Sequence, residues 1–462
     1  MRKQPNIIFV LLDDLGQEWI SCYGAKDIET PHIDEFAAGG IRFDNVYSMP
    51  QCTPSRMCLL TGQYPYRNGW VNHWDVPRWG AGARYDPDAY SCNLGRVMRE
   101  AGYSTAVAGK WQINDFRVEP DAMENAGFDT WCMWTGGEAN NPPSDERYWD
   151  PYIYRKGEAS QTCHDAFGPD ILNDFVIDFA REHKDDDNPF FVYYPMVLTH
   201  TPFTTTPHEM EVETDLDKHK AMVRYSDYLL GRLVDALDEM GIREDTLVIF
   251  TADNGTTGKI TGHVDGREVK GGKATTWETG VNIPFIANWP GTIPGGRESA
   301  ALIDFTDIIP TFSDLAGVAV PGQDKVDGHS LANLLRGESD RVDREWILAM
   351  GGQNNAQVSD RGVENEWYFR DRVVRDERYK LFISTDRQPE KLVDLHSDPE
   401  EQNDITGAES QEALRSRRKF EQLITQFPEK DADPICTPAP PQSWDLPVKV
   451  ESVVWKKGAP SS

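Results

Sequence analysis

Short apolar runs alternate with amphipathic segments through most of the chain. Four runs are apolar enough for buried strands: Ile7–Leu12, Ser104–Ala108, Phe190–Tyr194 and Thr246–Thr251. Between them, apolar residues recur every three or four positions, which predicts helices over Leu94–Glu100, Asp170–His183 and Met222–Met240. Alternating strands and helices favour an α/β fold, a large and mainly parallel sheet with helices on both faces.

The residues that follow these strands are polar. They are Asp13 and Asp14, Lys110, His200, and Asp253 and Asn254. Because the carboxyl ends of parallel strands share one edge of the sheet, we expect these side chains to meet there, which predicts an enzyme. Adjacent carboxylates at Asp13 and Asp14 fit a hard-metal site, and a solvated turn is an equally good interpretation of that pair alone. A solvated side chain is the ordinary alternative for Lys110.

The stretch Cys52-Thr-Pro-Ser-Arg56 is predicted to run from a loop into a helix. Pro54 and Ser55 suit a helix start, so Cys52 is expected just ahead of the N-terminus, where the dipole favours a thiolate or another anion. Arg56 follows one turn later and is close enough to hold the group at position 52. A buried structural Cys beside a surface Arg is the more common arrangement for a single Cys. Lys273 lies in a flexible, basic loop predicted over Lys270–Thr276.

The pattern changes beyond about residue 344. Short strands are predicted at Trp346–Met350, Trp367–Phe369, Val373–Val374, Tyr379–Ile383 and Leu392–Asp394. A helix over Gln411–Gln426 and a Pro-rich tail follow, which predicts a catalytic domain over 1–343 and a smaller antiparallel sheet with one helix over 344–462. Residues 114–169 have weak periodicity and are predicted to form a long excursion that shapes a pocket.

Composition excludes several classes of partner. The formal net charge is −29 over 462 residues, which argues against nucleic acid or anionic membranes as partners. No apolar run approaches the ~18 residues of a membrane span, and the run before Asp13 is too short for a signal peptide, so the cellular location stays open between the cytoplasm and export with a removed leader. Seven cysteines without metal-type pairs do not suggest a disulfide framework.

The Cys52–Arg56 stretch, followed by Leu60-Thr61-Gly62, resembles the signature of the type I, formylglycine-dependent sulfatases of the alkaline phosphatase superfamily. The resemblance implies that a formylglycine-generating enzyme oxidises Cys52 to Cα-formylglycine. It also implies one Ca²⁺ ion, whose ligands are Asp13, Asp14, Asp253, Asn254 and the oxygen of modified Cys52. The family residues that position formylglycine or hold the sulfate fall on Arg56, Lys110, His200 and Lys273.

The mechanism implied by the resemblance needs all these groups. A hydroxyl of the hydrated aldehyde, with Asp253 as base, attacks sulfur, and His200 or Lys273 protonates the leaving oxygen. The second hydroxyl then expels sulfate and restores the aldehyde. The family usually has His two residues after Lys110, where this chain has Gln112, which can contact the substrate or the diol but cannot accept a proton at neutral pH.

Three alternatives remain open. A sibling hydrolase of phosphodiesters or phosphonate monoesters would use the same modification, whereas a catalytically silent protein would only bind sulfate or sugar. A host that never forms formylglycine would leave an inert thiol.

The substrate is expected to be a sulfated carbohydrate, because the predicted pocket loops are rich in Trp, Tyr, Asn and Asp. These loops are Trp70–Tyr85, Asn114–Pro169, Thr256–Lys270 and Gln353–Trp367.

Overall fold

The computed structural model describes residues 4–71, 83–138, 141–351, 356–359, 362–365, 368–432 and 437–438. Its centre is a ten-stranded sheet with the order β13-β2-β12-β9-β1-β8-β4-β5-β6-β7. The strands are β1 (Asn6–Leu12), β2 (Ile41–Tyr47), β4 (Ser104–Lys110), β5 (Thr130–Trp134), β6 (Tyr152–Arg155), β7 (Gln161–Thr162), β8 (Phe190–Pro195), β9 (Thr246–Ala252), β12 (Phe285–Asn288) and β13 (Arg297–Asp304). The five middle strands β9, β1, β8, β4 and β5 are parallel, which confirms the predicted mainly parallel sheet.

The register of the middle strands brings their carboxyl ends to one level. Leu12 pairs with Ala252 on one side of β1, and Leu11 pairs with Pro195 on the other. Lys110 ends β4, where Gly109 has φ 125° and lies so close to β8 that a Cβ atom would meet the Pro195 carbonyl at 1.8 Å. The polar residues that follow these strands therefore gather at one edge, as predicted.

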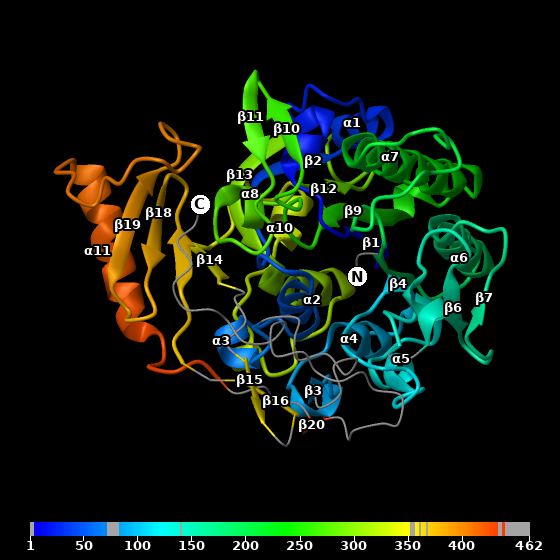
Figure 1. Ribbon diagram of the computed structural model, residues 1–462. Helices are drawn as coiled ribbons and strands as arrows, with labels where there is room; N and C mark the ends of the chain where they lie inside the picture. The colour runs from blue at the N-terminus through cyan, green and yellow to red at the C-terminus, as the bar shows by residue number, and fades with distance from the viewer. Residues whose placement is uncertain are drawn as a thin grey trace.

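Helices cover both faces of the sheet (Figure 1). One layer contains α1 (Pro31–Ala38), α6 (Gly168–His183) and α7 (Asp215–Glu239), and the other contains α2 (Cys52–Thr61), α4 (Leu94–Glu100), α9 (Ile308–Ala316) and α10 (Ala332–Leu335). Three shorter helices are α3 (Pro65–Asn68), α5 (Ala122–Asn125) and α8 (Glu278–Val281). Because both faces are covered, the middle strands are buried throughout and their sequences are continuously apolar.

Short 3₁₀ segments connect many of these elements. They are Gln17–Trp19, Ser21–Tyr23, Pro87–Ala89, Pro142–Asp145, Arg243–Asp245, Phe305–Asp307 and Gln323–Lys325. None of the helices in the described part of the chain combines the length and apolar character needed to cross a bilayer.

A second, antiparallel sheet lies in the C-terminal part, as predicted. Its order is β14 (Ile347–Met350), β17 (Arg372–Arg375), β18 (Tyr379–Ile383) and β19 (Pro389–Asp394), and α11 (Gln411–Gln426) packs on β18 and β19 at the outer side of the molecule (Figure 1). Three two-stranded pairings complete the structure: β10 (Thr261–Val264) with β11 (Arg267–Lys270), β15 (Ala356–Ser359) with β16 (Gly362–Asn365), and β3 (Ala83–Arg84) with β20 (Thr437–Pro438).

Several local predictions were wrong. The excursion over 114–169 contains β5, β6 and β7, which extend the main sheet to its edge. The strand β13 was missed because its first five residues alternate between half-buried and exposed positions. Phe369, predicted to lie in a strand, has an irregular backbone, and Trp367 lies outside the described residues.

Candidate active site

The carboxyl end of β1 supplies two buried carboxylates. The Asp13 N–H donates to the Leu198 carbonyl at 2.7 Å, which ties this turn to the segment after β8. Asp14 has φ 65°, a left-handed conformation that Asp tolerates, and its N–H donates to Asp253 Oδ1 at 3.1 Å. Strands β1 and β9 thus hold three carboxylates together without an intervening loop.

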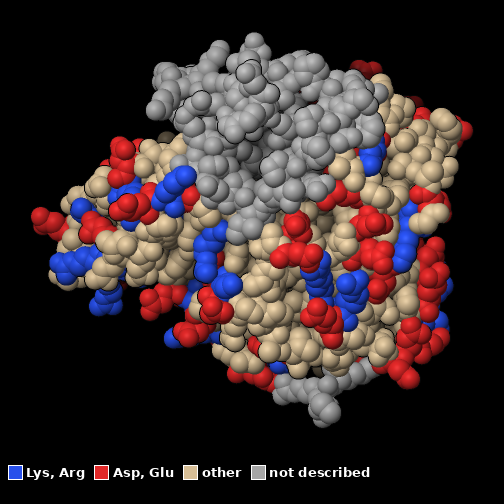
Figure 2. Space-filling model, turned by 90° about the horizontal axis from the view of Figure 1, so that it is seen from below, with Lys and Arg blue, Asp and Glu red and all other residues tan. Residues whose placement is uncertain are grey.

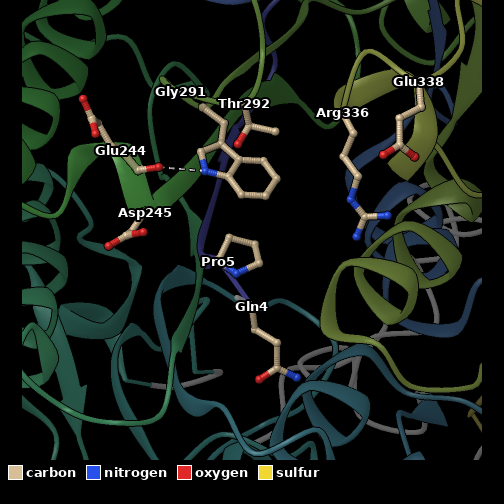
Figure 3. Close-up of a pocket in the computed structure, with 9 residues that line it drawn as sticks. Gln4, Pro5, Glu244, Asp245, Gly291, Thr292, Arg336 and Glu338 are labelled. Carbon is tan, nitrogen blue, oxygen red and sulfur yellow. Dashed lines mark hydrogen bonds between the residues drawn. The ribbon is translucent and has the colours of Figure 1, made fainter. Parts of the chain in front are cut away.

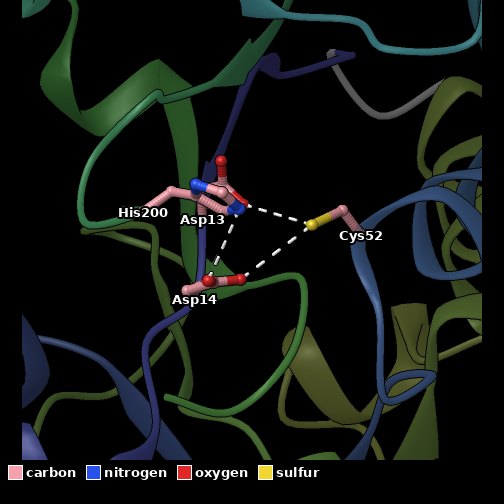
Figure 4. A group of neighbouring side chains, drawn as sticks. All are labelled: Asp13, Asp14, Cys52 and His200. Atoms are coloured by element: carbon pink, nitrogen blue, oxygen red, sulfur yellow. Dashed lines mark hydrogen bonds and ion pairs between the residues drawn. The ribbon is translucent and has the colours of Figure 1, made fainter. Parts of the chain in front are cut away.

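Helix α2 brings Cys52 to these carboxylates. Cys52 is the first residue of the helix, which begins three residues earlier than predicted, and Pro54 fits because first-turn residues need no hydrogen-bond donor. The Sγ atom lies 3.5 Å from Asp13 Oδ1 and 3.9 Å from Asp14 Oδ1 (Figure 4). Lys110 Nζ and Lys273 Nζ lie 3.4 Å and 3.7 Å from the same sulfur. Cys52 is therefore at the centre of the gathered groups.

Each carboxylate of the site is matched by one cation. Arg56 donates from Nη2 to Asp253 Oδ2 at 2.8 Å, Lys110 contacts Asp13 at 2.6 Å, and Lys273 contacts Asp14 at 2.6 Å. The side chain of Lys110 is 1% exposed, whereas those of Lys273 and His200 are each 21% exposed. An incoming anion would therefore meet Lys273 and His200 first.

Burial controls the protonation of several site residues. It raises the pKa of the Cys52 thiol to about 12, against the opposing effect of Lys110 and Lys273, so the unmodified residue stays a thiol although its helix position favours an anion. Burial also lowers the pKa of His200 to about 3, which keeps this imidazole neutral. Burial and the neighbouring Asp13 raise the pKa of Asp253 to about 6, although Arg56 acts in the other direction. An unmodified Cys52 is therefore a poor nucleophile.

The donor set fits a hard cation. Ligand atoms of Asp13, Asp14, Cys52 and His200 all lie within 4.8 Å of one another (Figure 4). Asn254 donates from Nδ2 to Asp14 Oδ1 at 2.8 Å, and its own Oδ1 is buried without a hydrogen-bond partner among the described residues. Oxygen atoms of three carboxylates and an unpartnered amide carbonyl are the ligands that Ca²⁺ prefers. These residues could hold that ion.

The loop that carries Lys273 is anchored from three directions. The Lys273 N–H donates to the Thr256 carbonyl, and the Ala274 N–H donates to the Pro50 carbonyl just before α2. Lys380, on β18 of the C-terminal sheet, donates from Nζ to the Thr276 carbonyl at 2.7 Å. The loop was predicted to be flexible, and Lys380 was not recognised from the sequence because nothing in its neighbourhood resembles a site residue.

Arg147 is a second residue that the sequence did not reveal. Its Nη1 lies 3.3 Å from Nδ1 of His200, and its guanidinium stacks on the Trp134 ring at 4.0 Å. It belongs to the segment predicted to shape a pocket, but no local pattern distinguishes it from other arginines there. A cation thus lies on the side of His200 opposite Asp14.

Gln112 has a different position from the other predicted residues. It follows β4 with φ 68°, and its buried Oε1 has no hydrogen-bond partner among the described residues. None of the hydrogen bonds found in the described structure joins it to Cys52 or to the carboxylates.

Trp70, at the start of a predicted specificity loop, is fully buried and donates to Tyr90, so it packs locally. Trp74 and Trp79 lie outside the described residues.

Two cavities lie away from Cys52. The first, of about 430 Å³, is lined by Gln4 and Pro5 before β1 and by Glu244 and Asp245 before β9 (Figure 3). It lies at the amino end of the strands whose carboxyl ends form the site, about 20 Å away for strands of this length. The second, of about 910 Å³, lies between the β10–β11 hairpin and residues 395–402, and Gly271, Gly272 and Thr275 of the Lys273 loop contribute to its wall.

Acidic side chains are spread over the visible surface rather than collected in one patch (Figure 2). Two cations of the site, Arg56 and Lys110, are buried, and Lys273 is partly exposed, in a chain of net charge −29. A local group of cations is what an anionic substrate needs to enter against the overall field.

Comparison with known proteins decides the family. The sulfatase family model matches residues 5–318, and a model described as the C-terminal part of N-sulphoglucosamine sulphohydrolase matches residues 272–427. The chain belongs to the sulfatase family. It is 27% identical over 474 aligned residues to an N-acetylgalactosamine-6-O-sulfatase of Bacteroides thetaiotaomicron, covering 87% of this chain and 90% of the relative.

Two further matches agree with this assignment to the sulfatases. A dog N-acetylgalactosamine-6-sulfatase is 31% identical over 361 residues, covering 72% of this chain and 66% of the relative. The solved structure of BT4656 in complex with its substrate D-glucosamine-2-N,6-O-disulfate superimposes with a TM-score of 0.69 at 23% identity, covering 92% of this chain and 97% of that one. The likeness to the sulfatases therefore extends over both sheets.

Proposed function

We propose that this sulfatase hydrolyses a sulfate ester of a sulfated carbohydrate, with formylglycine at position 52 and one bound Ca²⁺ ion. The observation that carries the proposal is the position of Cys52, within 4 Å of two carboxylates and two ammonium groups at the carboxyl edge of the sheet. A thiol with a pKa of about 12 stays protonated and is a poor nucleophile, so this position favours a modified residue. Formylglycine would supply a nucleophilic hydroxyl, and bound Ca²⁺ would neutralise the charge of the sulfate.

The protein's own residues would then divide the remaining work. Lys273 and His200, on the exposed side, would receive the sulfate oxygens, and buried Lys110 would stabilise the negative charge that develops on them. Asp253, whose orientation is fixed by Arg56, could accept a proton from the nucleophile. Burial keeps His200 neutral, whereas Asp14 holds the pKa of Lys273 above its ordinary value against the effect of burial, so Lys273 stays an ammonium ion that can donate hydrogen bonds to the sulfate.

The carbohydrate part of the proposal rests on the relatives. Several of them are named as sulfatases of N-acetylgalactosamine or N-acetylglucosamine, and one structural neighbour holds a sulfated glucosamine. We further propose that a formylglycine-generating enzyme acts on Cys52 during maturation. We also propose that residues 344–462 form a separate subdomain, whose Lys380 supports the Lys273 loop from outside the catalytic domain.

The test measures sulfate release from an aryl sulfate and a panel of sulfated sugars. The protein is co-expressed with a formylglycine-generating enzyme, and mass spectrometry of the Cys52 peptide confirms the modification. We expect release that requires Ca²⁺ and stops on chelation. Absence of release from protein with confirmed formylglycine and Ca²⁺ would contradict the proposal. Faster turnover of the matched phosphate diester would instead identify the sibling hydrolase.

A further inference from the structure

Arg147 differs from the other cations of the site in having no carboxylate partner. Arg56, Lys110 and Lys273 each contact an aspartate at 2.8 Å or less. Among the described residues, no carboxylate lies within 4.0 Å of the Arg147 guanidinium, and its Nε is buried without a hydrogen-bond partner. In so acidic a chain, a cation kept free of carboxylates beside an active site indicates an anionic ligand.

The contact with His200 does not satisfy this guanidinium. His200 Nδ1 lies 2.5 Å from the Thr201 carbonyl, and because a carbonyl oxygen can only accept, Nδ1 carries a proton and donates it there. That nitrogen then has no lone pair to accept a hydrogen bond from Arg147 Nη1 at 3.3 Å. Two donors therefore face each other, and the guanidinium keeps its hydrogen-bonding capacity for another group.

The surroundings hold Arg147 in one place. Its guanidinium stacks on Trp134, whose indole nitrogen is fixed by a hydrogen bond to the Ser144 carbonyl at 2.9 Å. The hydroxyl of the next residue, Tyr148, donates to the carbonyls of Val197 and His200. A fixed planar guanidinium suits two parallel hydrogen bonds to a carboxylate or a sulfate, which a lysine could not provide.

We propose that Arg147 binds a second anionic group of the substrate, a carboxylate or a further sulfate on the same or the adjoining sugar ring. This inference rests on the proposed sulfatase function and narrows its substrate class to sugars with at least two negative charges. The imidazole of His200 separates Arg147 from the Asp14 side, where the reacting sulfate would enter between His200 and Lys273. The distance between the two anion positions is therefore about the width of one imidazole ring, which two substituents of one sugar ring or of adjoining rings can span.

The first experiment compares kcat/KM for matched substrates of the formylglycine-containing protein. Each monosulfated sugar of a panel is compared with the same sugar carrying a second sulfate. It is also compared with a disaccharide in which the same sugar is linked to a uronate, and that disaccharide is tested both as the free acid and as the methyl ester. We expect a second charge to raise kcat/KM about tenfold or more, as a charge-assisted, two-point contact does. The sulfate and uronate arms show which anion Arg147 recognises.

The ratio between paired substrates identifies the role of Arg147. In Arg147→Gln, both rates are expected to fall because the surroundings of His200 change, but the preference for the second charge should disappear. Arg147→Lys should restore the preference only in part. Arg232→Gln, which removes a surface arginine paired with Asp174, should keep it. Equal losses on both members of each pair would show that Arg147 acts only through His200 and would overturn the proposal.

A binding measurement separates this inference from the proposed function. Cys52→Ala cannot turn over substrate by the proposed route, so calorimetry can give dissociation constants for the same sugars with and without Arg147→Gln. Tighter binding of the doubly charged sugar that depends on Arg147 would support the anion site even if no sulfate were released. If the doubly charged sugar bound with the same dissociation constant in Cys52→Ala with and without Arg147→Gln, the anion site at Arg147 would be excluded.

Discussion

Two groups of charges organise this molecule, and they differ in whether their lysines are exposed to solvent. The catalytic cluster consists of Asp13, Asp14, Asp253, Arg56, Lys110 and Lys273 around Cys52. The interface cluster consists of Glu278, Glu401, Arg375 and Lys380, between the Lys273 loop and the C-terminal sheet. Both contain equal numbers of carboxylates and cations.

The lysine of the interface cluster is enclosed. Lys380 Nζ contacts Glu278 at 2.9 Å, Glu401 at 2.7 Å and the Thr276 carbonyl at 2.7 Å, and its side chain is fully buried. The catalytic cluster, in contrast, leaves the Asn254 carbonyl without a partner and exposes about a fifth of Lys273. The comparison teaches that equal charge alone does not indicate function. The two clusters differ in the exposure of their lysines, since the Lys273 side chain is 21% exposed and the Lys380 side chain is fully buried.

The largest expected effect comes from removing the reactive residue of the catalytic cluster. Cys52→Ala should lower kcat by about 10⁴-fold or more, as loss of a nucleophile does, because no other described side chain occupies its position between the carboxylates and the ammonium groups. The ion pairs around it stay intact, so we expect the thermal midpoint to change little. Sulfate release and thermal unfolding are measured on the same preparation. Near-normal turnover would refute the role of residue 52.

Asp13→Asn should weaken metal binding and activity together. Burial alone would raise the pKa of Asp13, but Lys110 and Arg56 hold it well below the usual range, so this residue is a carboxylate at any working pH. Removing its charge should lower kcat/KM by about 10²–10³-fold, the cost of losing one electrostatic partner of a transition state. The rise in thermal midpoint on adding Ca²⁺ should shrink in parallel. Asp178→Asn, on the surface of α6, is the matched control, and an unchanged response to Ca²⁺ in Asp13→Asn would contradict the assignment.

Lys380→Met tests the interface cluster in the opposite way. It leaves Glu278 and Glu401 buried without their shared cation, which should cost about 3–5 kcal/mol of stability. Activity should also fall, because the Lys273 loop loses its anchor at Thr276, while the response to Ca²⁺ persists. Urea unfolding is compared with that of Lys184→Met, which removes an exposed lysine. A Lys380→Met protein of unchanged stability would mean that the interface cluster contributes little to the free energy of unfolding.

Sequence reasoning succeeded where one strand and its following residues carry all the information. The apolar run before Asp13 and the run before Asp253 predict buried parallel strands, and parallel strands bring their ends together by geometry alone. The bounds of α11 follow from its apolar stripe and from Ser410, which caps its first turn. These local rules reached most of the catalytic cluster.

The same reasoning missed residues whose role depends on distant partners. Arg147 and Lys380 become recognisable only when Trp134, His200 or Glu278 is brought beside them by the fold. The sequence also indicated that the helix dipole favours an anion at Cys52, but it did not show the depth of burial that raises the pKa of the thiol. Burial outweighs the dipole here.

Glu18 differs from the carboxylates of both clusters, because it is buried with no cation beside it among the described residues. Burial raises its pKa from 4.5 to about 7, although a hydrogen bond from Thr256 opposes the shift. The folded protein therefore binds this proton more tightly than the unfolded chain, and stability should decline as the pH rises from about 4.5 to 7 and level off above it. At 1.36 kcal/mol per unit, the decline is about 3 kcal/mol. Urea unfolding at pH 5 and 8 should show this difference, and Glu18→Gln should remove it.

The smallest expected effect concerns Gln112, at the position where the resemblance to the family implies a His. Its amide can orient a hydroxyl but cannot accept a proton, and its buried Oε1 has no partner among the described residues. Gln112→His should therefore raise kcat by about three- to tenfold, below the ~10²–10⁴-fold of a fully placed base, because the local backbone was not shaped for an imidazole. Gln112→Asn keeps the amide and shortens the side chain, so it should not accelerate the reaction. A gain unique to His, with a new basic limb in the pH profile of kcat, would show that the elimination step lacks a base. Equal rates in all three proteins would show that a group elsewhere in the catalytic cluster already performs that proton transfer.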